Sequence, residues 1–254
     1  MLAEAWGISR RALSRGGPWT VLVWTVVFML LVFGSLVLVG ASALLASFLH
    51  PHFGVTPSAA SVAGPAIGGI LLLYVILLAA GPFFMAGAYG VFGLAVQGQA
   101  VSWGTFWAMG KKLYGRGWGL VLYGLLYAIG LGIVAAVLMG LLHVLGTMVT
   151  GLLMVMSLPW ALRMIGGLFV DQLSWGAAFA ASFQGARYGG LLGSMFLSAI
   201  GYSLIWGLGL LLIHVWGPIG IVCYFGLDIA LSVVGPTWFF ALYVAAQPRL
   251  TRSV

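Results

Sequence analysis

The sequence predicts an all-α transmembrane protein: a six-helix bundle of three repeated units, each with an interfacial amphipathic helix and a kinked transmembrane hairpin. Three observations lead to this fold class: the composition, the distribution of basic residues and a phrase that recurs along the chain. The chain is 63% hydrophobic and only 5% charged, whereas about a quarter of the residues of soluble domains are charged. We therefore expect a single membrane domain over residues 1–254.

Six apolar segments are long enough to cross a bilayer, which takes about 20 residues of α-helix. They cover approximately residues 19–48, 65–97, 118–142, 147–170, 189–213 and 218–246. The first segment is far longer than the roughly 7–15-residue core of a cleavable signal peptide, so we expect it to be retained as a span. The weakest division lies at Gly146, where only a few residues separate the third span from the fourth.

The basic residues support six crossings. If the chain crosses six times, nine Lys and Arg residues fall on one side of the membrane, namely Arg10, Arg11, Arg15, Lys111, Lys112, Arg116, Arg187, Arg249 and Arg252. The loops on the other side contain no Lys or Arg. Because cytoplasmic loops carry an excess of these residues, we expect cytoplasmic termini and a multi-pass location in the plasma membrane of a prokaryote. The net charge of +7 then reflects topology and does not indicate nucleic acid as a partner.

A Trp-Gly phrase recurs ahead of three of the spans. The segments are "AWGISRRALSRGG" from residue 5, "SWGTFWAMGKKLYGRG" from residue 102 and "SWGAAFAASFQGARYGG" from residue 174. Trp and basic residues favour the headgroup region of the cytoplasmic leaflet, so we expect each segment to form a short interfacial helix that leads into a hairpin. The three units cover approximately residues 1–99, 100–172 and 173–254. Each crosses the membrane twice, so all three share one orientation about an axis along the membrane normal.

The returning helix of each unit contains a proline: Pro82, Pro159 and Pro236. Proline in a membrane helix frees a backbone carbonyl and kinks the helix, provided that neighbours satisfy the freed group. The combination of a Trp-containing basic segment, a hairpin and a Gly-Pro or Leu-Pro helix resembles several bacterial integral-membrane families. One of them is the membrane domain fused to some bacterial glycerophosphodiester phosphodiesterases. The resemblance covers most of the chain, but it brings no phosphodiesterase activity because no catalytic domain is attached.

Small residues recur on the third span at every fourth position: Gly124, Ala128, Gly132, Ala136 and Gly140. In lipid, small residues at this spacing let helix backbones approach closely. We therefore predict a helix-packing seam along this face. A shorter row of the same kind, on the fifth span, comprises Gly185, Gly189 and Gly193.

All four histidines fall at the outer ends of the outward-going spans one, three and five: His50, His52, His143 and His214. Helical phase places His143 about 20° from Gly132, so we expect it to face the seam. Three imidazoles at one depth could bind Zn²⁺ or Cu, and a pair could ligate a haem. The alternative is that these are interfacial or packing histidines, because no Asp or Glu lies in an outer loop to orient a metal ligand.

Two charges fall within the predicted spans. Asp228 lies near the middle of the sixth span, and Arg163 lies in the inner half of the fourth. Charged side chains within a membrane usually face the bundle interior and have a partner. The arrangement that costs least is a buried Arg163–Asp228 ion pair that fixes helix register, and the alternative is a functional, protonatable Asp228.

The sequence contains no nucleophile–base constellation, phosphate-binding loop or cysteine metal motif, and its one cysteine, Cys223, lies in an apolar run. A coupled carrier normally needs several intramembrane ionisable groups. We therefore expect a transport-related or accessory, structural membrane subunit without catalytic chemistry of its own. Its expected partners are the lipid bilayer and either other membrane subunits or further copies of itself. The alternative function is an extracytoplasmic Zn, Cu or haem site built from the histidines.

Overall fold

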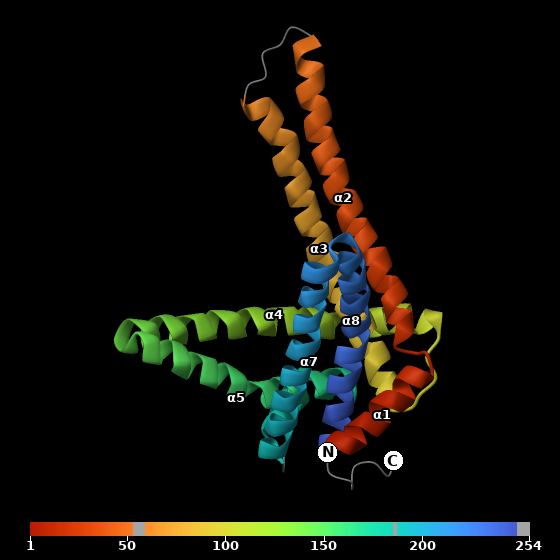
Figure 1. Ribbon diagram of the computed structural model, residues 1–254, viewed down its shortest axis with the longest axis vertical. Helices are drawn as coiled ribbons and strands as arrows, with labels where there is room; N and C mark the ends of the chain where they lie inside the picture. Colours follow the sequence, from red (N-terminus) through yellow and green to blue (C-terminus); the bar gives the residue numbers. More distant parts are fainter. Residues whose placement is uncertain (53–58, 185–186, 248–254) are drawn as a thin grey trace.

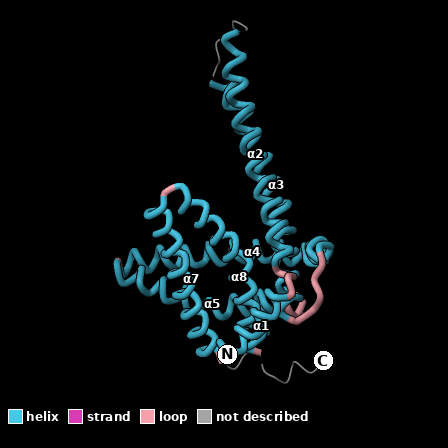
Figure 2. Tube along the Cα trace, turned by 45° about the vertical axis from the view of Figure 1, so that its right-hand side comes forward, coloured by secondary structure: helices cyan, strands magenta, loops and turns pink. Residues whose placement is uncertain are grey.

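The computed structural model describes residues 1–52, 59–184 and 187–247, and in these residues it contains helices and no strand (Figure 2). The elements are α1 (Leu2–Ser14), α2 (Trp19–His52), α3 (Ala59–Val96), α4 (Trp103–Leu142), α5 (Val144–Phe169), α6 (Trp175–Phe183), α7 (Tyr188–Trp216) and α8 (Pro218–Ala246). The all-α class predicted from the composition is therefore confirmed. Each of the six predicted spans corresponds to one of the long helices.

Five helices in the described residues are long and apolar enough to cross a membrane, namely α3, α4, α5, α7 and α8. The bent pair formed by α1 and the first part of α2, Trp19–Gly34, would make a sixth span, with an angle of 68° between the two parts. The length and composition of these helices fit a multi-pass membrane protein.

Only two of the three expected interfacial helices are separate elements. Gly16 and Arg187 both have a φ of 78° and interrupt the chain between α1 and α2 and between α6 and α7. The second segment has no such break, and α4 runs without interruption from Trp103 to Leu142. The physical reason is that its glycines, Gly115 and Gly117, keep helical geometry and no proline follows them.

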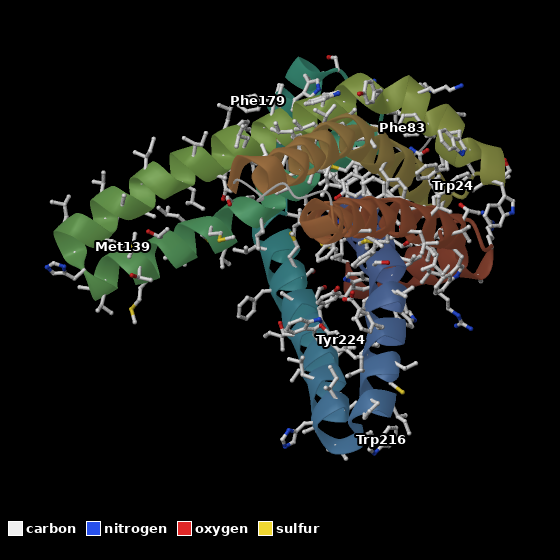
Figure 3. All side chains as sticks on the ribbon, turned by 90° about the horizontal axis from the view of Figure 1, so that it is seen from above. Trp24, Phe83, Met139, Phe179, Trp216 and Tyr224 are labelled. Atoms are coloured by element: carbon white, nitrogen blue, oxygen red, sulfur yellow. The ribbon has the colours of Figure 1, made fainter. Side chains whose placement is uncertain are left out.

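Three helical hairpins, α2–α3, α4–α5 and α7–α8, extend from a common base in different directions (Figures 1 and 3). The expected bundle is therefore confined to the base, and the six long helices do not run parallel along their whole length. The base contains the inner ends of the hairpins together with α1 and α6. Its largest fully buried side chains include Phe92, Phe106, Leu113, Phe169 and Leu242. The outer halves of the α4–α5 and α7–α8 hairpins are mostly exposed.

The closest helix packing occurs between α3 and the first part of α4. The ring of Phe83 lies 2.7 Å from the point where a Cβ on Gly110 would stand, and Met109 lies 2.7 Å from the equivalent point on Gly90. A Cβ on Gly117 would collide with the backbone carbonyl of Pro82. These glycines let the two backbones approach because they have no side chain to separate them.

The small-residue row predicted to pack within the chain does not do so. Gly124, Ala128, Gly132, Ala136 and Gly140 are all exposed, and no atom lies within 4 Å of the Cβ position of any of the three glycines. The α4–α5 contact uses another face of α4, where Tyr127 is hydrogen bonded to Ser157. Gly189 and Gly193 of the shorter row are likewise exposed, and Gly185 lies outside the described residues.

Replacing Gly117 by Ala is expected to destabilise the protein by about 1–3 kcal/mol, because the added methyl group must displace the Pro82 carbonyl or its helix. Gly124→Ala is the matched control on the same helix, since its methyl group would meet open space. We expect it to leave the melting temperature in detergent unchanged or slightly higher, because alanine favours helix. Equal melting temperatures for the two variants would contradict the α3–α4 packing described above.

Candidate functional site

Different residues reverse the chain at the tips of the α4–α5 and α7–α8 hairpins. His143 forms the whole turn between α4 and α5, with φ 49° and ψ −119°. Gly217 forms the turn between α7 and α8 with nearly the same geometry, φ 54° and ψ −124°. In each turn the glycine three residues further on, Gly146 or Gly220, lies directly against a carbonyl of the preceding helix. The structural equivalent of His143 is therefore Gly217 and not His214.

The structure does not bring the described histidines together. His143 and His214 are both exposed, and they belong to the tips of two hairpins that point in different directions (Figure 3). The side chains of His50 and His52 lie outside the described residues. Among the side chains that are described, no group of three or more His, Cys, Asp or Glu residues could hold a metal ion. The metal or haem hypothesis thus gains no support from the geometry.

Arg163 and Asp228 have different neighbours. Arg163 is 8% exposed and its guanidinium carbon lies 6.0 Å from the centre of the Tyr188 ring on α7. Asp228 is exposed on α8, and its carboxylate interacts electrostatically with Tyr202 of α7. Neither contact is an ion pair between the two residues, and the Arg163–Asp228 pair stays a prediction.

The polar residues that do converge lie at the base, around the segment that follows α5. Asp171 accepts hydrogen bonds from Tyr243 and, at 2.8 Å, from Gln247 of the segment after α8. Arg116 of α4 donates to the carbonyls of Leu168 and Gln172, at 3.2 and 2.6 Å. These bonds join α4, α5 and α8, and every group named is satisfied within the protein. We interpret this network as structural.

The base closes into a ring of helix contacts. Each of α3, α5 and α8 has an aromatic residue one or two positions after its proline. That residue packs against α4, α6 or α1, respectively. Phe84 of α3 packs edge-on against Phe106 of α4, with ring centres 5.0 Å apart. Trp160 of α5 contacts Phe183 of α6 at 5.1 Å. The third contact closes the ring, because Trp238 of α8 meets Trp6 of α1 at 6.3 Å.

The three contacts of this ring are filled to different degrees. The contact between α3 and α4 holds a dense aromatic cluster, in which Trp24 and Phe83 take part (Figure 3). The contact between α5 and α6 holds a second cluster, in which Trp160, Phe179 and Phe183 all touch one another. The contact between α1 and α8 contains one aromatic pair and opens into a cavity of about 970 Å³.

We call this cavity the α1 crevice, and it is the best candidate for a functional site. It lies between α1 and the α7–α8 hairpin, and its walls are mainly apolar. Its lining residues include Trp6, Arg10, Ser198, Gly201, Tyr202 and Trp238. Its volume is at the upper end of the range typical of ligand pockets, about 300–1,000 Å³. An adjoining hollow of about 380 Å³ shares Tyr202, Leu231 and Gly235 with it.

Most polar groups in the walls of the α1 crevice are already satisfied. The indole N–H of Trp238 donates to the hydroxyl of Ser198 at 2.7 Å, and that hydroxyl donates to the Ser194 carbonyl at 2.7 Å. The hydroxyl of Ser14 donates to the Arg11 carbonyl at 3.0 Å. Arg10 is the one charged residue among the described lining residues. Its guanidinium group makes no hydrogen bond or ion pair with another described residue. The crevice therefore combines a long apolar wall with one available cation.

Sequence reasoning did not single out the α1 crevice. The first Trp-Gly phrase did predict a short helix where α1 lies, and the aromatic residue after each proline is a signal for the ring of contacts. The lining residues come from α1, the start of α2, α7 and α8, and 178 positions separate Trp19 from Leu197, so no local pattern reveals the cavity.

Comparisons with known proteins give no match, because no family model, no curated protein and no solved structure is significantly similar to the chain. The resemblance to the membrane domain of glycerophosphodiester phosphodiesterases therefore stays a prediction.

Replacing His143 by Gly is expected to stabilise the protein by about 1–3 kcal/mol, because a positive φ strains any residue with a side chain. The same change at His214 is the control, since this residue lies inside α7 and glycine in a helix costs about 0.5–1 kcal/mol. Thermal unfolding in detergent should thus move in opposite directions for the two variants. A lower melting temperature for His143→Gly would show that the imidazole makes a contact that the turn geometry does not reveal.

Proposed function

We propose that the chain is an integral membrane subunit, transport-related or accessory, that has no catalytic chemistry of its own. The observation that carries this proposal is the division of the molecule into a packed base and three hairpins, of which α4–α5 and α7–α8 have exposed apolar outer halves. Leu126, Leu141 and Val222, for example, are 69, 73 and 72% exposed. Such surfaces are stable only against lipid or other membrane helices.

The charges support an orientation with the base at the cytoplasmic surface. Lys111, Lys112 and Arg187 are exposed on helix segments of the base, and α1 contributes Arg10 and Arg11. The outer ends of the hairpins carry no Lys or Arg among the described residues. Because basic residues are retained in the cytoplasm, the base belongs on that side and both termini are cytoplasmic.

A threefold repeat is supported by two further features. The three helix prolines, Pro82, Pro159 and Pro236, are separated by 77 residues in each case. The aromatic residues that follow them make the three contacts of the ring, between α3 and α4, α5 and α6, and α8 and α1. We infer three related units whose hairpins surround an axis through the base.

Hairpins that cross one flat bilayer must run closer to parallel than the directions in Figure 1. The outer halves of α4–α5 and α7–α8 are largely exposed, so rotation of these two hairpins about the base would disturb few buried contacts outside it. We infer that the membrane aligns the hairpins while the base keeps its packing. The open small-residue face of α4, at Gly124, Gly132 and Gly140, then becomes available to a helix of another subunit or copy.

The topology can be tested with single cysteines in a Cys223→Ser background. A cysteine at Val144, at the tip of the α4–α5 hairpin, is expected to react with a membrane-impermeant maleimide in intact cells. A cysteine at Lys111, in the base, is expected to react only after the cells are opened. Labelling of the Lys111 position in intact cells would contradict the cytoplasmic base.

The accessory role predicts an assembly larger than one chain. Particles extracted from native membranes with a styrene–maleic acid copolymer should therefore contain more protein than a single 26.7 kDa chain, measured as polypeptide stoichiometry by native mass spectrometry. Gly132→Leu, on the open face of α4, is expected to reduce that stoichiometry, and Gly151→Leu on α5 serves as the control, since both positions are open in the single chain. Particles that hold one copy of this chain and no other protein would contradict the proposal.

A further inference from the structure

The α1 crevice differs from the other two contacts of the ring in a way that points to a ligand. Aromatic side chains fill the contacts between α3 and α4 and between α5 and α6. The contact between α1 and α8 has the single pair Trp6–Trp238 and leaves about 970 Å³ open. Trp6 is 63% exposed at this cavity, so a large apolar wall is left without a covering side chain from the described residues.

We propose that the α1 crevice binds one anionic phospholipid, with the phosphate at Arg10 and an acyl chain along the groove between α1 and the α7–α8 hairpin. The assignment takes from the proposed function only that the base lies at a membrane surface. A lipid of the leaflet next to the base would then enter with its headgroup at α1 and its tails toward the hairpin.

The charge of the crevice selects the headgroup. Arg10 is the only charged residue among the described residues that line the crevice, and a guanidinium binds phosphate through paired N–H donors. The two neighbouring arginines are directed differently, because Arg15, which follows α1, donates to the Gly98 carbonyl at 2.6 Å, and Arg11 reaches back over Gly7. The headgroup therefore has one cation to bind among the described lining residues.

The walls of the crevice select the acyl chains. The hydroxyl groups of Ser14 and Ser198 and the indole N–H of Trp238 are hydrogen bonded to protein groups. These side chains therefore leave few hydrogen-bonding groups that a ligand would have to satisfy. Leu197, Ile205 and Leu231 extend this apolar surface along the α7–α8 hairpin. The adjoining hollow of about 380 Å³ continues it past Tyr202 and gives room for a second chain.

Native mass spectrometry of the full chain in detergent tests the proposal, with phosphatidylglycerol and phosphatidylcholine added in turn. We expect one phosphatidylglycerol to bind at the lowest concentrations, and phosphatidylcholine to bind more weakly. Arg10→Gln should weaken phosphatidylglycerol binding about tenfold or more, as expected for one charge-assisted hydrogen-bonded contact. Arg10→Lys should restore most of the loss.

Two pairs of variants separate the crevice from the rest of the surface. Gly201 lines the crevice and has open space at its Cβ position, so Gly201→Trp should occupy the groove and abolish binding of both lipids. Gly193→Trp, at an open position on the same helix outside the crevice, should bind normally. Lys111→Gln is the charge control for Arg10→Gln, because Lys111 is exposed on α4, far from the lining residues in sequence.

Several outcomes would overturn the proposal. They are undiminished binding to Arg10→Gln or Gly201→Trp, equal losses for Lys111→Gln and Arg10→Gln, or equal affinities for the two lipids. Displacement of phosphatidylglycerol by equimolar inorganic phosphate would indicate a plain anion site and would also overturn it. If Gly201→Trp lowers the melting temperature, Gly201→Leu replaces it. All measurements are made in micelles, so a failed topology test leaves the binding result intact.

Discussion

The close approach of α3 to the first part of α4 is the contact on which the rest of the structure depends. Glycines at positions 90, 110 and 117 remove the side chains that would hold the two backbones apart. Phe106 and Leu113 of α4 are then buried against α3 at 1% exposure each. Arg116, on the same stretch of α4, reaches the carbonyls that end α5 and anchors the following segment. The α3–α4 packing thus positions the α2–α3 and α4–α5 hairpins and the segment that follows α5.

The base also explains why one of its contacts is a candidate site and the others are not. Within the base, α3 contacts α4, α5 contacts α6, and α8 contacts α1. Aromatic side chains of the protein fill the first two of these contacts. At the third, α1 presents Trp6 and Arg10 across a gap that no other side chain of the described residues fills. A gap of this kind in an otherwise dense base, with mainly apolar walls and one cation among its described lining residues, fits the proposed membrane lipid.

The hairpin tips show how one residue can change the meaning of a sequence pattern. His143 and His214 seemed equivalent because both lie at the outer end of an outward-going span. The backbone shows instead that His143 is the turn itself and that Gly217 is its counterpart. His214 lies three residues before Gly217, nearly one helical turn, and only the φ and ψ angles reveal which residue reverses the chain. The positive φ strains a histidine in that position. This strain favours a role of His143 in its own turn over a site that it shares with the other histidines.

The sequence by itself determined the helical class, the number and position of the long apolar helices, and the gathering of basic residues at one end. These features follow from composition and from short-range patterns, because a helix that crosses lipid must satisfy its own backbone and carry an apolar surface. Only the tertiary structure decided which glycines pack, which charges meet and where a cavity remains. Gly117 packs and Gly124 does not, although both lie on α4 with the same chemistry. The difference depends on which helix lies opposite, and that is set by contacts between residues far apart in the chain.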